Sequence, residues 1–290
     1  MEGNVLVGTC NWSDHQGYYP PGLKSTERIA YYARHFPVVE VDSTYYSLQP
    51  RRNFEAWCAR TPEGFLFNVK AYRELTQHDR TPEGQVETPR AETFEKFSYS
   101  LEPMRECGKL KAVHFQFPPW FRFSDANFEY IATCREFLPD DLLAVEFRHR
   151  SWLEGERAER TLGFLREHEL SYVMVDEPQV GSGSVPPTVA VTNPELAIVR
   201  FHGRNAETWY KKGLKSSTER FKYLYSKEEL AEWMPAVESV REQAKEVHLL
   251  LNNNYGNYAV RNAVDLMELL GQPAPQLELP EMPTEQPQLI

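Results

Sequence analysis

Residues 142–152, LLAVEFRHRSW, join an apolar strand to two charges that share one face. The four apolar residues at 142–145 are typical of a parallel strand that is covered on both sides. Glu146 and Arg148 follow, and side chains two apart on a strand point the same way. Charges inside a protein are costly unless they are paired or used. The stretch therefore requires a fold that encloses polar side chains at the carboxyl end of a strand.

Eight segments of the chain have the composition of buried parallel strands. They are residues 4–8, 37–42, 65–70, 112–117, 142–148, 171–176, 196–202 and 247–253. Segments with helical spacing lie between them, at 25–36, 51–61, 91–107, 125–137, 153–169, 226–245 and 258–270. Strands that alternate with helices predict an α/β fold, and the count of eight favours a closed (β/α)8 TIM barrel over a doubly wound open sheet.

The unit between the sixth and seventh strands is irregular. Residues 177–195, EPQVGSGSVPPTVAVTNPE, are rich in glycine, serine and proline, which predicts a loop with a short extra strand at 188–191.

Elsewhere, Ser226 and Glu229 predict a capping box, and Ser25 and Asp125 are predicted N-caps. We expect a single domain over residues 1–270. A proline-rich tail, 271–290, then either packs in extended form or is disordered.

The composition disfavours several classes of protein, among them non-specific nucleic-acid binders, disulfide-rich proteins and membrane proteins. Of 290 residues, 41% are hydrophobic and 26% are charged, and the formal net charge is −10. This acidic balance disfavours non-specific binding to nucleic acid or anionic lipid, although it allows a local basic pocket. The four cysteines lack C-x-x-C spacing, so a zinc ribbon or disulfide framework is not expected. No signal peptide or membrane-length apolar run is visible, which predicts a cytoplasmic protein without a membrane partner.

The charged residues of the eight segments fall on one face. In a barrel, the alternate apolar set faces the helices, and the polar members of the other set cluster at the carboxyl ends, where such barrels have their sites. The predicted inward set is Glu40, Asp42, Asn68, Lys70, His114, Gln116, Glu146, Arg148, Met174, Asp176, Arg200, His202, Leu250 and Asn252. Opposite charges nearly cancel in it. Two interpretations follow, a closed salt-bridge network without chemistry or a pocket for a polar or anionic small molecule.

The second interpretation assigns roles to these residues. The predicted catalytic residues are Glu146, Asp176, Glu40 and His202. Carboxylates would transfer protons, and the deep position of Glu40 predicts a raised pKa. The predicted ligand-binding residues are Asp42, Lys70, His114, Gln116, Arg148, Arg200, Asn252, Asn254, Trp12 and Tyr18. Residues 204–223, which interleave basic and aromatic side chains, are predicted to form a lid over the barrel mouth.

Motifs for metals and common cofactors are missing from the sequence. There is no H-E-x-x-H or H-x-H spacing, and the last strand ends in three asparagines at 252–254. We therefore predict no metal and no other cofactor. The sequence also lacks the glycine-rich nucleotide loops and the G-x-S-x-G motif, so dinucleotide-binding, P-loop and α/β-hydrolase interpretations lose their main support.

Several long motifs in order resemble those of the YecE-like family (domain of unknown function 72). They include GTCNW (8–12), GYYPPGL (17–23), VEVDSTYY (39–46), FNVKAYRELT (67–76), FQFPPWF (115–121), AVEFRHRSW (144–152), VRFHGRN (199–205) and LNNNYGNYAVRNA (251–263). The resemblance implies a (β/α)8 barrel distantly similar to sugar isomerases and endonuclease-type barrels, without an established reaction. Two features depart from the family's usual pattern. Cys10 and Asn11 replace Ser-Gly, and Gln77 separates Thr76 from His78.

The favoured function is an enzyme, a hydrolase or an isomerase, that acts by acid–base chemistry on a small anionic substrate, phosphorylated or sugar-like. One alternative is a metal-dependent phosphodiesterase with residues 204–223 as its docking strip. Nucleic acid is thus a partner that the sequence allows but does not favour. The other alternative is a non-catalytic ligand-binding protein. The sequence predicts no oligomeric state.

Overall fold

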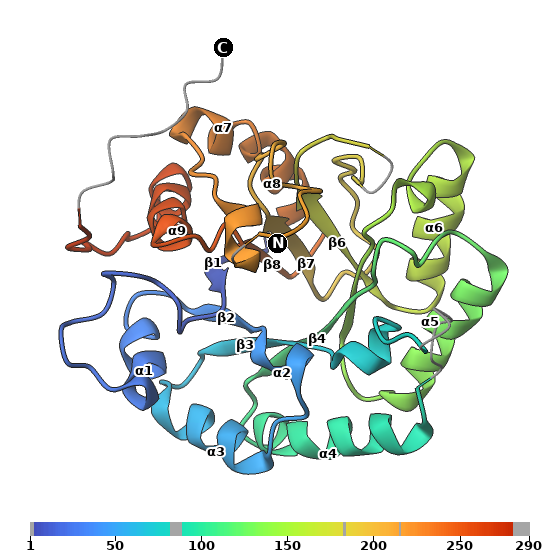
Figure 1. Ribbon diagram of the computed structural model, residues 1–290, viewed down its shortest axis with the longest axis horizontal. Coiled ribbons are helices and arrows are strands. Elements are labelled where there is room, and N and C mark those ends of the chain that lie inside the picture. Colours follow the sequence, from blue (N-terminus) through green and yellow to red (C-terminus); the bar gives the residue numbers. More distant parts are fainter. Residues whose placement is uncertain (1–2, 82–88, 182–183, 215, 281–290) are drawn as a thin grey trace.

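Eight parallel strands form a closed barrel at the centre of the computed structural model, which describes residues 3–81, 89–181, 184–214 and 216–280 (Figure 1). The strands are β1 (Asn4–Cys10), β2 (Val38–Val41), β3 (Leu66–Lys70), β4 (Leu110–Gln116), β5 (Leu143–Glu146), β6 (Ser171–Asp176), β7 (Ala197–Phe201) and β8 (Glu246–Leu251). Each strand pairs with the next one along the chain, and β8 closes the barrel on β1. The predicted TIM barrel is confirmed.

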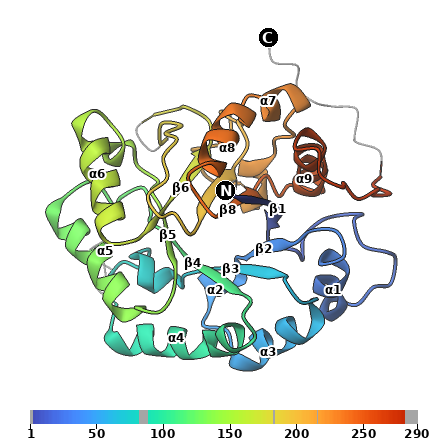
Figure 2. The same cartoon turned by 180° about the vertical axis from the view of Figure 1, so that it is seen from behind.

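The helices surround the strands in both views of the molecule (Figures 1 and 2). They are α1 (Arg28–Tyr32), α2 (Ser43–Tyr46), α3 (Arg51–Arg60), α4 (Ala91–Glu106), α5 (Asp125–Phe137), α6 (Glu156–Glu167), α7 (Lys227–Ala231), α8 (Met234–Arg241) and α9 (Tyr258–Leu269). Short 3-10 helices occupy Ser25–Glu27, Arg73–Thr76, Arg150–Trp152 and Ser217–Phe221. None of the helices in the described part of the chain is both long enough and apolar enough to cross a membrane.

The connection from β6 to β7 is irregular, as predicted. Its described residues form no helix, but residues 188–191 form no strand either, so the extra strand is wrong. Two prolines precede this segment, and the amide of Thr188 is bonded to the carbonyl of Pro186 in a tight turn. This turn and the missing proline N–H groups prevent a regular ladder there.

The helix starts confirm one of the three predicted caps. Ser226 and Glu229 form the capping box at α7. At α5 the cap is Ser124, whose hydroxyl accepts a hydrogen bond from the Asn127 amide, so the prediction of Asp125 is one residue late. Ser25 lies inside its 3-10 helix and is not the cap. The segment predicted as one helix at 226–245 is divided into α7 and α8, with a proline in the first turn of α8.

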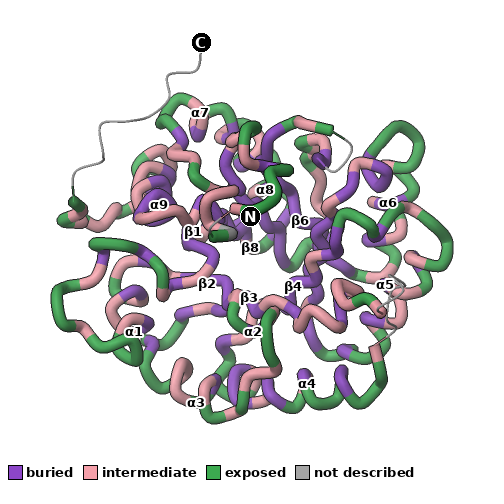
Figure 3. Tube along the Cα trace, viewed as in Figure 1, coloured by how far each residue is buried: buried purple, intermediate pink, exposed green. Residues whose placement is uncertain are grey.

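The core lies between the barrel and the helices. The outward side chains Val39, Phe67, Val113 and Phe201 are fully buried, and Figure 3 shows buried residues gathered along the central strands. The described residues of the tail beyond Gly271 form no helix or strand and pack on the rest of the domain. Gln272 donates a hydrogen bond to the Val5 carbonyl at 2.8 Å, and leucines at 277 and 279 pack against the core. Residues 281–290 lie outside the described part.

Gly203, directly after β7, has a backbone conformation that few residues adopt. Its φ is +85°, and a Cβ there would lie 2.7 Å from the Cβ of Tyr223. We expect Gly203→Ala to lower the free energy of unfolding by about 2–3 kcal/mol, because backbone strain and a clash add. Gly108→Ala is the control, since Gly108 has φ +68° with nothing within 4 Å of the added Cβ. Denaturant unfolding should show a smaller loss there, and equal losses would contradict the steric part of this prediction.

Candidate functional site

The strand register places most of the predicted polar side chains on the inner face of the barrel. The cross-strand pairs are Cys10 with Glu40, Glu40 with Asn68, Lys70 with His114, Gln116 with Glu146, and Arg200 with Leu250. Residues paired across parallel strands point to the same side. The predicted facing is therefore confirmed for every strand that carries these residues except β6.

Four buried side chains form a closed ring of opposite charges, which we call the charge ring: Glu40, His114, Glu146 and Arg200. Each is at most 1% exposed. Arg200 lies between the carboxylates, with Nη2 2.5 Å from Glu40 Oε1 and Nη1 2.6 Å from Glu146 Oε2. His114 joins the same carboxylates, with Nδ1 2.9 Å from Glu40 and Nε2 3.1 Å from Glu146. Both nitrogens of His114 thus face anions.

The charge ring fixes the protonation of its members. Burial opposes a charge on His114, but Glu40 and Glu146 outweigh burial and raise its pKa. Burial likewise opposes ionisation of Glu40, yet Arg200 and His114 carry the pKa of Glu40 far below its usual range. The prediction of a raised pKa for Glu40 is therefore wrong. The raised pKa favours the protonated form of His114, and with His114 protonated two cations balance two anions in the ring.

The charge of Glu146, at the carboxyl end of the buried strand β5, is paired on both of its oxygens. Its Oε2 meets Arg200 and His114, and its Oε1 lies 3.0 Å from Arg148 Nη1 and 3.1 Å from His202 Nε2. Burial opposes its ionisation, but Arg200 and His202 hold the pKa of Glu146 well below the usual range. With four partners around its two oxygens, Glu146 stays ionised and organises its neighbours.

His202 is held in one tautomer. The side-chain amide of Asn252 donates a hydrogen bond to its Nδ1 at 2.8 Å, so the proton resides on Nε2, which faces Glu146. Burial and then Arg148 lower the pKa of His202 to about 3. The imidazole is therefore neutral at ordinary pH.

A second acid–base pair, Asp42 and Lys70, lies above the charge ring. Lys70 Nζ is 3.5 Å from Asp42 Oδ1, and the two side chains are 13% and 18% exposed. The same Oδ1 accepts no hydrogen bond among the described residues. Burial raises the pKa of Asp42, with Lys70 opposing and Glu40 adding to the rise. Asp42 and Glu40 thus have pKa values that are pushed apart, an arrangement typical of acid–base sites.

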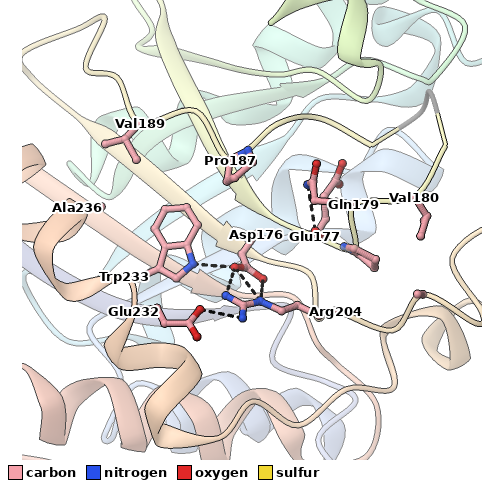
Figure 4. A pocket seen from close by; sticks show the side chains of 12 residues that line it. Asp176, Glu177, Gln179, Val180, Pro187, Val189, Arg204, Glu232, Trp233 and Ala236 are labelled. Atoms are coloured by element: carbon pink, nitrogen blue, oxygen red, sulfur yellow. Dashed lines mark hydrogen bonds and ion pairs between the residues drawn. The ribbon is translucent and has the colours of Figure 1, made fainter. Parts of the chain in front are cut away.

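The sixth strand has the opposite phase from the predicted one. β6 pairs Asp176 with Phe201 and Met174 with Val199, and both partners face the helices. Asp176 is bound by side chains from segments that follow β7. Figure 4 shows its contacts with Arg204 (2.8 Å) and Trp233 (2.7 Å), and the hydroxyl of Tyr225 lies 2.6 Å from the same carboxylate. The prediction that Asp176 and Met174 point into the barrel is wrong. Because the strand is apolar in both phases before its last residue, polarity could not assign its facing.

Glu177 is the inward acid that sequence reasoning missed. Val173 and Val175 face inward, and Glu177 is the next residue in that phase. Its Oε1 accepts a hydrogen bond from the Val185 amide at 2.7 Å, and its Oε2 lies 3.2 Å from Arg148 Nη1. Burial raises the pKa of Glu177 to about 7, although Arg148 opposes this. The only indication in the sequence was an acidic residue directly after the strand. To place it inside the barrel, one had to know which residues of β6 face inward.

The other predicted site residues are more dispersed. Gln116 reaches the charge ring, with Oε1 3.4 Å from Arg200. Asn254 has a buried Oδ1 without a hydrogen-bond partner among the described residues. Trp12 packs edge-on against Trp57 at 5.2 Å, and the hydroxyl of Tyr18 lies 2.7 Å from His35 Nδ1. Trp12 and Tyr18 therefore pack under the first loop and do not join the ring.

His78 was also missed, because a residue separates it from its partner. Gln77 has a left-handed φ of 57°, which bends the chain so that Thr76 Oγ1 lies 2.7 Å from His78 Nδ1. The imidazole lies between Tyr45, at 5.0 Å, and Trp120, at 5.8 Å. Burial, followed by nearby cations, lowers the pKa of His78 to about 3.

Asn11 has a φ of 72°, a conformation that Asn adopts more readily than most residues other than Gly.

The lid segment, 204–223, packs against the end of β7. The rings of Trp209 and Phe221 lie 6.2 Å and 6.0 Å from that of His202, and Arg148 lies 5.0 Å above the Trp209 ring. Beside them is a cavity of about 540 Å³, which we call the cation pocket. It is lined by Pro119, Arg148, Trp209, Tyr210, Lys211, Lys212, Gly213, Leu214 and Arg220. Among these described residues there are four cations and no carboxylate.

Within the described ranges, no group of three or more His, Cys, Asp and Glu side chains has an arrangement suited to a metal ion. The two carboxylates that would be the natural ligands, Glu40 and Glu146, are already paired with protein cations. These residues therefore do not offer an open metal site.

The comparisons with known proteins agree with this barrel. The family model described as a protein of unknown function, DUF72, matches residues 6–287. The UPF0759 protein YunF of Bacillus subtilis (strain 168) is 40% identical over 269 residues, covering 92% of this chain and 94% of YunF.

Two crystal structures of DUF72 family proteins have the same fold. One from Enterococcus faecalis V583 is 30% identical, with a TM-score of 0.84 over 96% of this chain and 100% of that one. One from Thermotoga maritima MSB8 is 36% identical, with a TM-score of 0.79 over 93% of this chain and 100% of that one. The match along nearly the whole sequence confirms the resemblance of the motifs, and the chain belongs to the DUF72 family.

Proposed function

We propose that the protein is an enzyme that binds a small anionic substrate, phosphorylated or sugar-like, at the barrel mouth and transforms it by acid–base chemistry. The observation that carries this proposal is the cation pocket, where four cations line a cavity of about 540 Å³ without a carboxylate. This volume is in the usual range for small-molecule sites.

The cations of the pocket are incompletely compensated. Both ion pairs of Arg148 use Nη1, so its Nε and Nη2 form no ion pair with the described residues. The Nε of Arg220 is buried without a hydrogen-bond partner in the described part of the chain. Burial and then the charge of Arg148 lower the pKa of Arg220. An anion between the two guanidinium groups would relieve this repulsion and satisfy planar donors that suit phosphate or carboxylate.

The proton transfer is assigned to Asp42. Its raised pKa favours the protonated form more than in an ordinary aspartate, and its buried Oδ1 has no hydrogen-bond partner among the described residues. Glu40 and Glu146 remain ionised and hold the cations around them. Lys70, 3.5 Å from Asp42, would stabilise negative charge that develops on the substrate.

Arg148→Met tests the anion pocket. We expect the affinity for sulfate or a sugar phosphate to fall at least tenfold in titration calorimetry, because the variant lacks the guanidinium that faces the pocket. Lys245→Met is the matched control, since Lys245 forms an exposed pair with Glu195 and does not line the pocket. Equal affinity in the two variants, or no anion binding by the wild type, would overturn the proposal.

A ligand-binding protein without turnover is the second candidate. The observation that favours it is the charge ring, whose two carboxylates both form ion pairs with Arg200 and His114 and need no reaction to explain them. Turnover of any member of a panel of sugar phosphates and sugar acids would exclude this candidate.

A further inference from the structure

Arg148 connects the cation pocket to a buried acid. Its guanidinium lines the pocket, and its Nη1 lies 3.2 Å from Glu177 Oε2 and 3.0 Å from Glu146 Oε1. The side chain of Glu177 is fully buried. Arg148 is the one cation within ion-pair distance of Glu177 among the described residues.

The two carboxylates compete unequally for this cation. Glu146 also has Arg200, His114 and His202 as partners. For Glu177 the other contact is a neutral amide, that of Val185. An anion that binds Arg148 from the pocket side therefore weakens the stabilisation of the Glu177 charge more than that of the Glu146 charge, because Glu146 keeps three further partners.

We propose that Glu177, which does not itself line the cation pocket, takes up a proton when an anion binds at Arg148. This inference rests on the proposed anion binding and adds its linkage to pH. The pKa of about 7 supports it, because Glu177 is then half protonated near neutral pH. Since linkage is reciprocal, anion affinity rises as the pH falls from 8 to 6 and levels off below that range.

Three of the groups around Glu177 have pKa values that are shifted out of this window. From β5, the pKa of Glu146 is well below the usual range. From β6, burial raises the pKa of Tyr172. Beyond β7, His202 has a pKa of about 3.

Two further histidines complete the surroundings. His78, near Arg148, has a pKa of about 3. His114 has a raised pKa and is separated from Arg148 by Glu146. A variant of Glu177 is therefore needed to exclude a contribution from His114.

Sulfate is the probe, because it remains a dianion from pH 6 to pH 8 and phosphate does not. For a tenfold coupling, which is within the usual range, we expect sulfate to bind about fivefold more tightly at pH 6 than at pH 8. Calorimetry of the wild type in phosphate-free buffers with different ionisation enthalpies should show uptake of about 0.4 proton per sulfate at pH 7.

Glu177→Gln should remove both the pH dependence and the proton uptake while it retains sulfate binding. Gln keeps an oxygen for the Val185 amide, which preserves the local structure. Glu207→Gln is the control, because Glu207 is an exposed acid of the lid. That variant should keep the wild-type pH dependence.

The outcomes separate this inference from the proposed function. Sulfate affinity that is equal at pH 6 and pH 8 in the wild type overturns the proton linkage but leaves the anion pocket standing. The same holds if Glu177→Gln keeps the full proton uptake. Failure of the wild type to bind sulfate at any pH overturns both proposals.

Discussion

Replacing Arg200 by methionine is expected to lower the free energy of unfolding by about 3–5 kcal/mol, the usual cost of leaving a buried charge without its partner. Arg200 is fully buried, and its two terminal nitrogens contact Glu40 and Glu146. Its removal leaves those two carboxylates with His114 as the cation that they share. Denaturant unfolding of the purified variant measures the loss.

The pH dependence of the Arg200→Met variant provides an internal check. In the wild type, the pKa of Glu40 is lowered in the folded state, so its contribution to stability is present above the unfolded pKa and is lost as the pH falls through the folded pKa. Without Arg200, burial raises that pKa instead, and the variant should lose most stability at higher pH. Adding Glu40→Gln should restore part of it. Lys245→Met, which removes an exposed ion pair, should change stability by about 0.5 kcal/mol or less. An Arg200→Met variant as stable as this control would contradict the charge ring.

Asp42→Asn is expected to reduce turnover of the natural substrate by about 10²- to 10⁴-fold, the range for loss of a general acid or base. Asparagine keeps the shape of the side chain but cannot exchange the proton. Because Asp42 does not line the cation pocket, anion affinity should stay within about threefold of the wild type. Steady-state kinetics with any substrate found in the panel, together with sulfate calorimetry, measures both effects.

Asp140→Asn, a change at an exposed aspartate, is the matched control and should leave turnover unchanged. Wild-type turnover by the Asp42→Asn variant would remove Asp42 from the mechanism. A large loss of anion affinity in the same variant would instead indicate that Asp42 acts in binding.

The sequence predicted the barrel because the evidence for it is periodic. Eight apolar segments alternate with segments of helical spacing, and alternate polar side chains such as Glu40 and Arg200 mark the inner face. The sequence could not show which residues of the charge ring pair with each other, because Arg200 contacts Glu40 across the barrel and the two are 160 residues apart along the chain. The sequence predicted that Glu40 is buried but not that Arg200 is its partner. Its pKa was therefore expected to be raised, whereas it is lowered.

The misassigned residues have a local cause. Between Ser171 and Asp176, β6 carries no charged residue on either face, so Asp176 was placed inward by analogy with the other strand ends, and Glu177 was overlooked. The positions of His78 and Ser124 depend on single backbone angles or caps, which the residue pattern does not determine. The cation pocket depends on how the lid segment folds onto Arg148. The basic–aromatic composition predicts a lid segment but not how that segment folds.

The most direct measurement of anion binding at the barrel mouth is a crystal structure of the wild type with tungstate, located by its anomalous signal. A peak within about 4 Å of the guanidinium groups of Arg148 and Arg220 is the predicted result. At a tungstate concentration that calorimetry shows to be saturating, a peak elsewhere with none in the cation pocket would contradict the proposed site.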